Sequence, residues 1–212
     1  MSGAFWATDV VRVGDLTAWI LARSDAVDRY VFGIAGPPGS GKSTLAGRLG
    51  ADVDAPVVPM DGFHLPNATL DARGLRDVKG SPVTFAATEF VDVVRALRDP
   101  NRLVACPMFD RTIDEPIADR IRVSSAARVV IVEGNYLLLD RAPWSSLSGL
   151  FDAIAYLDVP AEVRLQRLIE RHVEFGRSRA DAEKFVRRSD WANTALIEAT
   201  KAGADLVISM DD

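Results

Sequence analysis

A glycine-rich stretch, GPPGSGKS at residues 36–43, carries the strongest chemical signal in the sequence. It matches the pattern G-x-x-x-x-G-K-[ST] without a mismatch, and it lies between an apolar run and a helix-like segment, as this pattern requires. Glycines let the backbone wrap a phosphate with its N–H groups pointing inward, and a helix N-terminus adds positive potential. We therefore predict a nucleoside triphosphate site. Its predicted binding residues are Gly36, Pro37, Pro38, Gly39, Ser40, Gly41, Lys42, Ser43 and Thr44.

Two side chains of this loop have separate predicted roles. Lys42 supplies a point charge for the β and γ phosphates, and the Ser43 hydroxyl is suited to binding Mg²⁺. Mg²⁺ and a nucleoside triphosphate, either ATP or GTP, are therefore the expected cofactors. The loop alone leaves the fate of the γ-phosphate open. A kinase transfers it to a hydroxyl, whereas a switch or motor NTPase transfers it to water. A guanine-specific switch carries N-K-x-D after a later strand, and this sequence contains no such run.

A lone carboxylate, Asp61, directly follows a second short apolar run at residues 56–60. A kinase that acts on an alcohol needs a group that accepts or orients the hydroxyl proton, placed in line with the γ-phosphate. Asp61 is suited to that role if its strand lies beside the phosphate loop. The alternative is that Asp61 begins an ordinary Asp-Gly turn. Its position in the sequence does not decide between the two.

The elements that must position these residues are indicated by apolar runs that alternate with helical patterns. Five strands are expected at residues 29–36, 56–60, 127–134, 153–159 and 205–210. Helices are expected at residues 8–23, 42–49 and 85–98, from Pro160 onward and after Ser178. Strands that are apolar on both faces favour an α/β fold, with a parallel sheet covered by helices on both sides. Ligands of such sheets bind beyond the carboxyl ends of the strands, where the first three runs end in AGPPGSGKST, MDGFH and VEGNY.

The bulk composition suits one globular domain, and we predict that residues 1–212 form it. The chain is 48% hydrophobic and 26% charged, with a net charge of −5, which argues against nucleic acid or an anionic membrane as the main partner. No apolar run approaches the ~18 residues of a membrane span. A single cysteine, Cys106, and a start without a basic-then-apolar segment favour the cytoplasm. The expected partner is a small-molecule acceptor, and the sequence also allows a homodimer.

Three further strings resemble one family of P-loop kinases, which includes type I pantothenate kinase, uridine kinase and phosphoribulokinase. They are MDGFHLPN (60–67), RGLRDVKGSPVTF (73–85) and VEGNYLLL (132–139). The resemblance runs from about residue 31 to 139 and continues weakly to the end. It implies the three-layer P-loop NTPase fold, with the five predicted strands in the spatial order 2-3-1-4-5, and a lid. It also implies transfer of the ATP γ-phosphate to a hydroxyl of a small metabolite, such as a nucleoside, a pantothenate-like compound or a sugar.

The resemblance assigns roles to particular residues. Asp61 matches the general base of the family, and Glu133 matches the acidic residue that helps Ser43 hold Mg²⁺. The arginine-rich segment 164–188 matches the lid, in which Arg167 and Arg171 correspond best to the arginines that close over the phosphates. The alternative for this segment is an exposed helix with internal salt bridges, since Glu170 and Glu174 are interleaved.

The expected acceptor-binding regions are residues 61–84, which are mostly loop by composition, and residues 107–120. Candidate acceptor-binding residues are His64, Phe109, Asp110, Arg111 and Asn193.

Phe109-Asp110-Arg111 aligns with Tyr-Ser-His of pantothenate kinases and Tyr-Asp-Phe of uridine kinases, so Arg111 fits neither. An arginine facing the acceptor suggests several hydroxyls or an acidic group, as in a sugar or a sugar acid. Arg111 could instead pair with Asp114 or Glu115, and Lys79 in the preceding loop is expected to be a solvated charge. A fructose-type sugar kinase, or a P-loop NTPase or regulatory nucleotide-binding protein without an acceptor, are the alternative functions.

Overall fold

A six-stranded parallel sheet forms the centre of the molecule in the computed structural model, which describes residues 9–10 and 12–209. Its strands are β1 (Asp9–Val10), β2 (Tyr30–Ala35), β3 (Val57–Pro59), β6 (Val129–Gly134), β7 (Ala153–Asp158) and β8 (Leu206–Ser209). They lie in the order β1-β8-β7-β2-β6-β3, and every pairing is parallel. The five expected strands are therefore present in the order 2-3-1-4-5, which confirms the predicted fold class.

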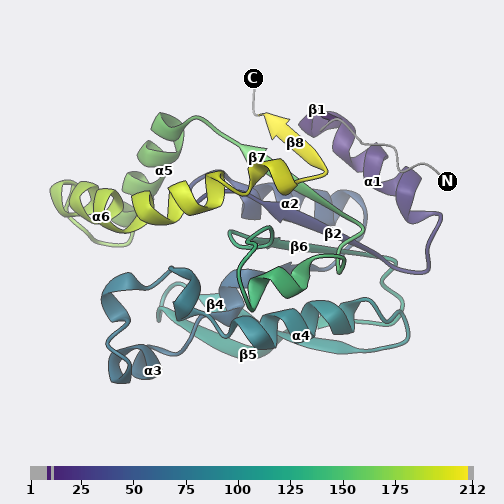
Figure 1. Ribbon diagram of the computed structural model, residues 1–212, viewed down its shortest axis with the longest axis horizontal. Coiled ribbons are helices and arrows are strands. Elements are labelled where there is room, and N and C mark those ends of the chain that lie inside the picture. Colours follow the sequence, from purple (N-terminus) through teal and green to yellow (C-terminus); the bar gives the residue numbers. More distant parts are fainter. Residues whose placement is uncertain (1–8, 11, 210–212) are drawn as a thin grey trace.

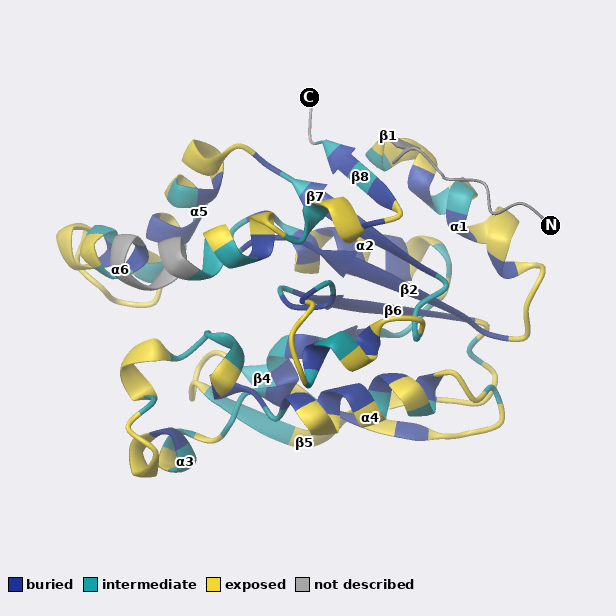
Figure 2. Ribbon diagram, in the orientation of Figure 1, coloured by how far each residue is buried: buried dark blue, intermediate teal, exposed yellow. Residues whose placement is uncertain are grey.

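Helices cover both faces of the sheet and produce three layers (Figure 1). The α-helices are α1 (Leu16–Ser24), α2 (Lys42–Asp52), α3 (Asn67–Ala72), α4 (Ala87–Leu97), α5 (Ala161–Glu174) and α6 (Arg179–Glu198). Because side chains alternate along a strand, Phe32 and Ile34 of β2 pack with α1 and α2, whereas Val31 and Ala35 pack on the α4 side. The central strands are buried on both faces (Figure 2). None of the described helices is long and apolar enough to cross a membrane.

The N-terminal segment differs from the helix that was expected at residues 8–23. Asp9 and Val10 instead form strand β1 beside Leu206 and Val207, a 3-10 helix η1 (Val13–Asp15) follows, and α1 begins only at Leu16. Edge pairing with β8 satisfies backbone groups that a helix would otherwise satisfy internally. Val11, which was expected on the apolar helix face, lies outside the described residues.

Two regions contain structure that was not predicted: residues 61–84 were expected to be mostly loop, and no element was assigned to residues 104–123. Residues 61–84 contain α3 and three short 3-10 helices, η2 (Met60–Phe63), η3 (Arg76–Val78) and η4 (Pro82–Thr84). Residues 104–123 form an antiparallel hairpin of β4 (Val104–Asp110) and β5 (Glu115–Val123), which is a second, two-stranded sheet. The hairpin was not predicted because β5 is polar and largely exposed, so it lacks the apolar run that identifies a core strand.

Arg29 ties the amino end of β2 to three other segments. Its side chain is only 3% exposed, and its guanidinium donates to the carbonyls of Ala127, Leu97, Asp99, Pro100 and Ser124 at 2.8–3.4 Å. The charge is thus buried among oriented backbone dipoles, which offset the cost of removing it from water. The guanidinium therefore fastens the ends of α4 and of β5 to the central strand.

Arg29→Ala should lower the free energy of unfolding by about 3 kcal/mol or more, because it leaves several buried carbonyl groups without a donor. Urea unfolding monitored by circular dichroism measures the change. The matched control is Arg95→Ala, which removes an exposed arginine paired with Asp92 one turn away on α4 and should change stability by less than about 0.5 kcal/mol. Equal stabilities for the two variants would contradict this role of Arg29.

Candidate active site

The phosphate loop between β2 and α2 has the conformation that only glycine adopts without strain at three positions. Gly36, Gly39 and Gly41 have φ values of 148°, 77° and 93°. A side chain at Gly39 would also come within 2.7 Å of the carbonyl oxygen of Arg164 in α5. The glycines therefore serve two purposes, since they turn backbone N–H groups inward and let the loop rest directly on α5.

Lys42 is the first residue of α2, and its ammonium group is buried beneath the loop. Its Nζ donates to the carbonyl oxygen of Pro37 at 2.9 Å. Burial lowers the pKa of Lys42 to about 8, although the carboxylates of Glu133 and Asp61 oppose this shift by stabilising the charge. A triphosphate bound in the loop would add negative charge beside this ammonium group and would restore its preference for the charged form.

The Ser43 hydroxyl donates to Oε1 of Glu133 at 2.8 Å, so the two predicted Mg²⁺ ligands are in direct contact. Glu133 is 5% exposed, and burial raises its pKa, assisted by the charge of Asp61. A hydroxyl and one carboxylate at a phosphate loop fit Mg²⁺, which takes few protein ligands and completes its shell with phosphate oxygens and water. Among the described residues, no three His, Cys, Asp or Glu side chains form a larger metal cluster.

Asp61 lies at the neighbouring strand end, as the sequence predicted. In the sheet register Pro59 of β3 is opposite Glu133 of β6, and Asp61 follows Pro59 within the 3-10 helix η2. The next residue, Gly62, packs so tightly against β4 that an added side chain would lie 2.3 Å from the carbonyl oxygen of Pro107. This close approach fixes Asp61 between the sheet and the hairpin.

Aromatic rings form a wall next to Asp61. Nδ1 of His64 lies 2.8 Å from the carbonyl oxygen of Asp61, and the His64 ring packs on Phe85 at 4.0 Å and on Phe109 at 4.9 Å. Burial lowers the pKa of His64, which keeps the ring neutral near pH 7. Behind Phe85, the Tyr136 hydroxyl donates to the Gly80 carbonyl at 2.6 Å. His64 and Phe109, both predicted acceptor residues, are thus brought together beside the predicted base.

The loop of residues 61–84 is fastened to the turn of the β4–β5 hairpin. Lys79, expected to be solvated, is 16% exposed in its side chain, and its Nζ donates to Asn67 Oδ1 and to two oxygens of Asp114, each at 2.7 Å. The Glu115 carboxylate accepts from the Asn67 backbone N–H at 3.0 Å.

Because Asp114 and Glu115 are engaged in this way, the alternative in which Arg111 pairs with either of them does not occur. Arg111 Nη2 instead lies 3.4 Å from Asp61 Oδ2. Asp110 shapes the same turn, since its Oδ1 accepts from the Thr112 backbone N–H at 2.8 Å.

The arginines that share one face of α5 have different surroundings. Arg164 is buried, and it donates to the Val159 carbonyl at 2.9 Å and to Glu198 at 2.5 Å, so it joins α5 to α6. Arg167 donates to the Ser40 carbonyl at 3.3 Å and thereby supports the phosphate loop from outside. Arg171 is close enough to Lys42 for its charge to lower the pKa of that lysine. Both predicted lid arginines therefore lie at the phosphate site.

Within the expected lid, residues 164–188, parts of α5 and α6 form a helix pair with its own small hydrophobic core. Leu168 and Ile169 of α5 pack with Ala182 and Val186 of α6, and Gly176 turns the chain between them at φ 92°. Figure 1 shows this pair at the same end of the sheet as α3 and the β4–β5 hairpin. The predicted acceptor residue Asn193 lies half-buried on α6, outside the group around Asp61 described above.

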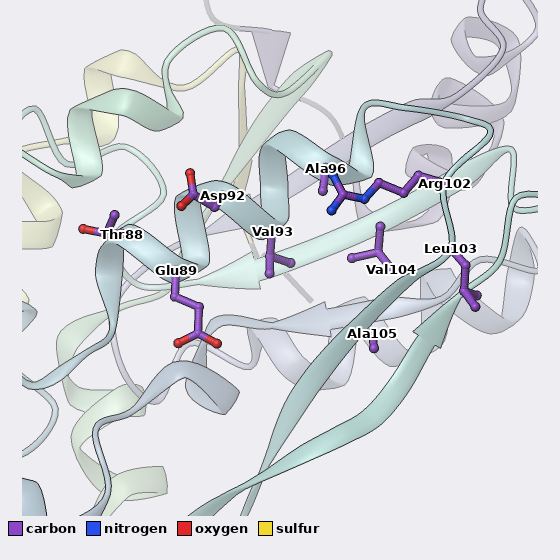
Figure 3. Close-up of a pocket in the computed structure, with 9 residues that line it drawn as sticks. All are labelled: Thr88, Glu89, Asp92, Val93, Ala96, Arg102, Leu103, Val104 and Ala105. Atoms are coloured by element: carbon purple, nitrogen blue, oxygen red, sulfur yellow. The ribbon is translucent and has the colours of Figure 1, made fainter.

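A groove of about 480 Å³ lies elsewhere, between α4 and β4 (Figure 3). Its lining comprises Thr88, Glu89, Asp92, Val93, Ala96, Arg102, Leu103, Val104 and Ala105. None of these residues belongs to the phosphate loop or to the strand ends that carry Asp61 and Glu133. The candidate active site is therefore defined by converging charges and hydrogen bonds, and this groove is separate from it.

Comparison with known proteins identifies the family. The model of the phosphoribulokinase / uridine kinase family matches residues 31–211. The chain belongs to this family. A Schizosaccharomyces pombe protein named "Putative uridine kinase C227.14" is 36% identical over 195 residues, which cover 85% of this chain and 83% of the relative. The pantothenate kinase of Xanthobacter autotrophicus is 32% identical over 178 residues, which cover 77% of this chain and 54% of that one.

Solved structures of this kinase family show the same fold. The crystal structure of a "putative fructose transport system kinase" from Silicibacter sp. TM1040 has a TM-score of 0.83 and 38% sequence identity, and the match covers 91% of this chain and 98% of that one. A P-loop kinase fold of this kind implies ATP binding, in agreement with the geometry of residues 36–43.

Lys42→Met should stabilise the nucleotide-free kinase at pH 7 by about 2 kcal/mol, because it removes a buried charge. The native pKa of about 8 lies below the unfolded value, so the cost of burying the charge is fully present below pH 8 and disappears as the pH rises toward 10.5. Urea unfolding at several pH values between 7 and 10 should show the wild-type protein gaining stability relative to the variant.

The control replaces Lys184, an exposed lysine on α6, by methionine. Its stability should follow the wild-type pH profile. If Lys42→Met also followed that profile at every pH, the ammonium group of Lys42 would not be buried at a cost.

The same Lys42 variant should lose the stabilisation that MgATP gives the wild-type protein, which thermal unfolding with and without MgATP measures.

Proposed function

We propose that this protein transfers the γ-phosphoryl group of ATP to a hydroxyl of a small metabolite, with Asp61 as the general base. The observation that carries the proposal is the convergence of three charged groups, Lys42, Glu133 and Asp61, where β2, β6 and β3 end. Their strands are adjacent, because Ile34 of β2 and Pro59 of β3 both lie opposite Glu133 of β6 in the sheet register. The charge of Asp61 accordingly raises the pKa of both Lys42 and Glu133. Relatives named as uridine and pantothenate kinases support transfer to an alcohol.

The nucleotide side of the reaction uses the phosphate loop. Backbone N–H groups of residues 36–43 bind the phosphates, and Lys42 places its charge at the β and γ positions. Ser43 and Glu133 would hold Mg²⁺, which would supply positive charge beside the phosphates. Arg167 and Arg171 of α5 stabilise the negative charge that spreads over the equatorial oxygens of the transferred group.

The acceptor side provides the proton acceptor and the surface against which the acceptor rests. The acceptor oxygen forms a bond to the γ-phosphorus as the bond to the bridging oxygen of ADP breaks, and the hydroxyl proton passes to an Oδ of Asp61. His64 and Phe109 offer an apolar wall beside that carboxylate. Asp110, Arg111 and Asn193 are the polar candidates that select the acceptor.

A sugar acceptor is the second, narrower candidate. It is supported by the similarity to the Silicibacter structure, since that protein is named for a fructose transport system and the match covers nearly all of both chains. The polar turn that follows Phe109 also suits a compound with several hydroxyls, because Asp110 and Arg111 together offer acceptors and donors. A coupled assay with MgATP against nucleosides, pantothenate, hexoses, pentoses and sugar acids separates this candidate from the others.

Asp61→Asn should lower kcat by about 10²–10⁴ while leaving MgATP affinity nearly unchanged, because the amide keeps the shape of the side chain but cannot accept the proton. Coupled assays give kcat, and calorimetric titration gives nucleotide affinity. Asp71→Asn is the control, since Asp71 is an exposed carboxylate on the adjacent α3. Normal turnover by Asp61→Asn would remove this residue from the mechanism. Brisk ATP hydrolysis by the wild-type protein, not accelerated by any added alcohol, would indicate instead that the protein is a hydrolytic NTPase.

The same variant tests the proximity of the two carboxylates without any turnover. Because the negative charge of Asp61 raises the pKa of Glu133, Asp61→Asn should lower the pKa of Glu133 in the nucleotide-free protein. Carboxyl carbon chemical shifts followed by NMR over pH 3–9 report this pKa, and Asp71→Asn should leave it in place. If the pKa of Glu133 were the same in Asp61→Asn as in the wild-type protein, the carboxylates of Asp61 and Glu133 would be too far apart to interact.

A further inference from the structure

Arg111 and Asp61 form an ion pair that joins the hairpin turn to the predicted base. The two residues are 50 positions apart, and Nη2 of Arg111 lies 3.4 Å from Oδ2 of Asp61. Arg111 directly follows β4, in a turn that is held by the Asp110–Thr112 hydrogen bond and by the contacts of Lys79 with Asp114. The backbone that carries Arg111 is therefore held in place by tertiary contacts, within reach of Asp61.

The ion pair is weak, so Arg111 can readily exchange Asp61 for another anionic partner. Only one nitrogen reaches one oxygen, and the side chains of Arg111 and Asp61 are 45% and 34% exposed. Exposed pairs of this kind contribute little to stability. An arginine that binds a carboxylate or a phosphate with two parallel hydrogen bonds, at about 2.7–2.9 Å, makes a much stronger contact. Arg111 has donors available for such a contact because Asp61 engages only one edge of its guanidinium.

Two other cationic side chains of the loop of residues 61–84 are bound to other partners. Lys79 directs its ammonium group to Asn67 and Asp114, and Arg76 pairs with Asp71 at 3.4 Å. His64 turns Nδ1 toward the Asp61 carbonyl, and burial keeps its ring neutral. Arg111 is thus the cationic side chain that the hairpin presents to Asp61, where it can reach a compound bound against Phe109.

The pairing conflicts with the work proposed for Asp61. Arg111 engages Oδ2 of Asp61, an oxygen that could otherwise accept the hydrogen bond of the acceptor hydroxyl. An acceptor that leaves Arg111 in place would find this oxygen already engaged. An acceptor that draws Arg111 away would release the carboxylate for its role as base, and it would also compensate the repulsion that an anionic compound meets from Asp61 and Glu133.

We propose that Arg111 binds an anionic group of the acceptor, a carboxylate or a phosphate close to the hydroxyl that is phosphorylated, and leaves Asp61 as it does so. This inference rests on the proposed function, because it assigns Arg111 to the acceptor of that reaction. It narrows the substrate class to hydroxy acids, such as sugar acids, or to sugar phosphates. The contact of Arg111 with Asp61 in turn disfavours neutral acceptors.

The test compares matched compounds that differ in charge. Sugar acids are measured beside their primary amides, and sugar phosphates beside their parent sugars, by calorimetric titration into the protein saturated with MgADP, where no transfer occurs. At least one anionic class should bind at least about tenfold more tightly than its neutral counterparts. Arg111→Gln should abolish that difference, and Arg111→Lys should retain part of it, since lysine keeps the charge but not the planar fork.

Arg122→Gln is the matched control, because Arg122 is an exposed arginine on β5 of the same hairpin and lies outside the acceptor-binding region of residues 107–120. It should keep the wild-type preference. Equal or weaker binding of every anionic compound by the wild-type protein would overturn the proposal, and so would a preference that survives Arg111→Gln. The class that shows the preference identifies the group as a carboxylate or a phosphate.

Turnover separates this inference from the proposed function. With MgATP, the anionic class that binds should be phosphorylated by the wild-type protein, and Asp61→Asn should bind it without phosphorylating it. If binding depended on Arg111 but the wild-type protein phosphorylated none of the bound compounds, the proposed function would fail while the Arg111 site would stand. If neutral compounds were phosphorylated as efficiently as anionic ones and independently of Arg111, the kinase function would stand and the Arg111 site would fail.

Discussion

The buried ammonium group of Lys42 must be stabilised by the dipoles and charges of the groups around it. Removing such a charge from water is costly unless oriented dipoles and opposite charges surround it. The Pro37 carbonyl and the Glu133 carboxylate provide part of this compensation, and the phosphates of a nucleotide are suited to provide the rest. Glu133 reaches this position because β6 lies directly beside β2, and the strand order of the sheet therefore determines the charge balance of the site.

The two sides of the site are built in different ways. The nucleotide side consists of backbone and packing, because a glycine-rich loop rests on α5 and begins α2. The acceptor side consists of side chains from a loop and a hairpin, which Lys79 and Glu115 fasten together. Membership of the phosphoribulokinase / uridine kinase family accounts for the first side. The second side includes Arg111 in the hairpin turn, next to the predicted base.

Structural features that depend on local sequence patterns were predicted correctly. The phosphate loop and the five core strands follow from spacing and from continuous apolar runs, and the strand order follows from the family resemblance. The β4–β5 hairpin was missed because β5 is polar and lacks such a run, and β1 was missed because it contains only two residues. The contact of Arg111 with Asp61 was not predicted. The alternative pairing with Asp114 or Glu115 does not occur, because Lys79 and Asn67 engage those two residues through tertiary contacts that no local pattern encodes. Arg29 was missed for the same reason, because its partners lie 68–98 residues away.

The central claim is that Asp61 and the γ-phosphate lie on opposite sides of one acceptor hydroxyl. A crystal structure with Mg²⁺, a non-hydrolysable ATP analogue and a phosphorylatable acceptor tests this geometry most directly. We expect an Asp61 carboxylate oxygen about 2.6–3.2 Å from the acceptor hydroxyl, with that hydroxyl facing the γ-phosphorus. An Asp61 side chain that turns away from the acceptor, or an acceptor hydroxyl that faces another base, would contradict the account.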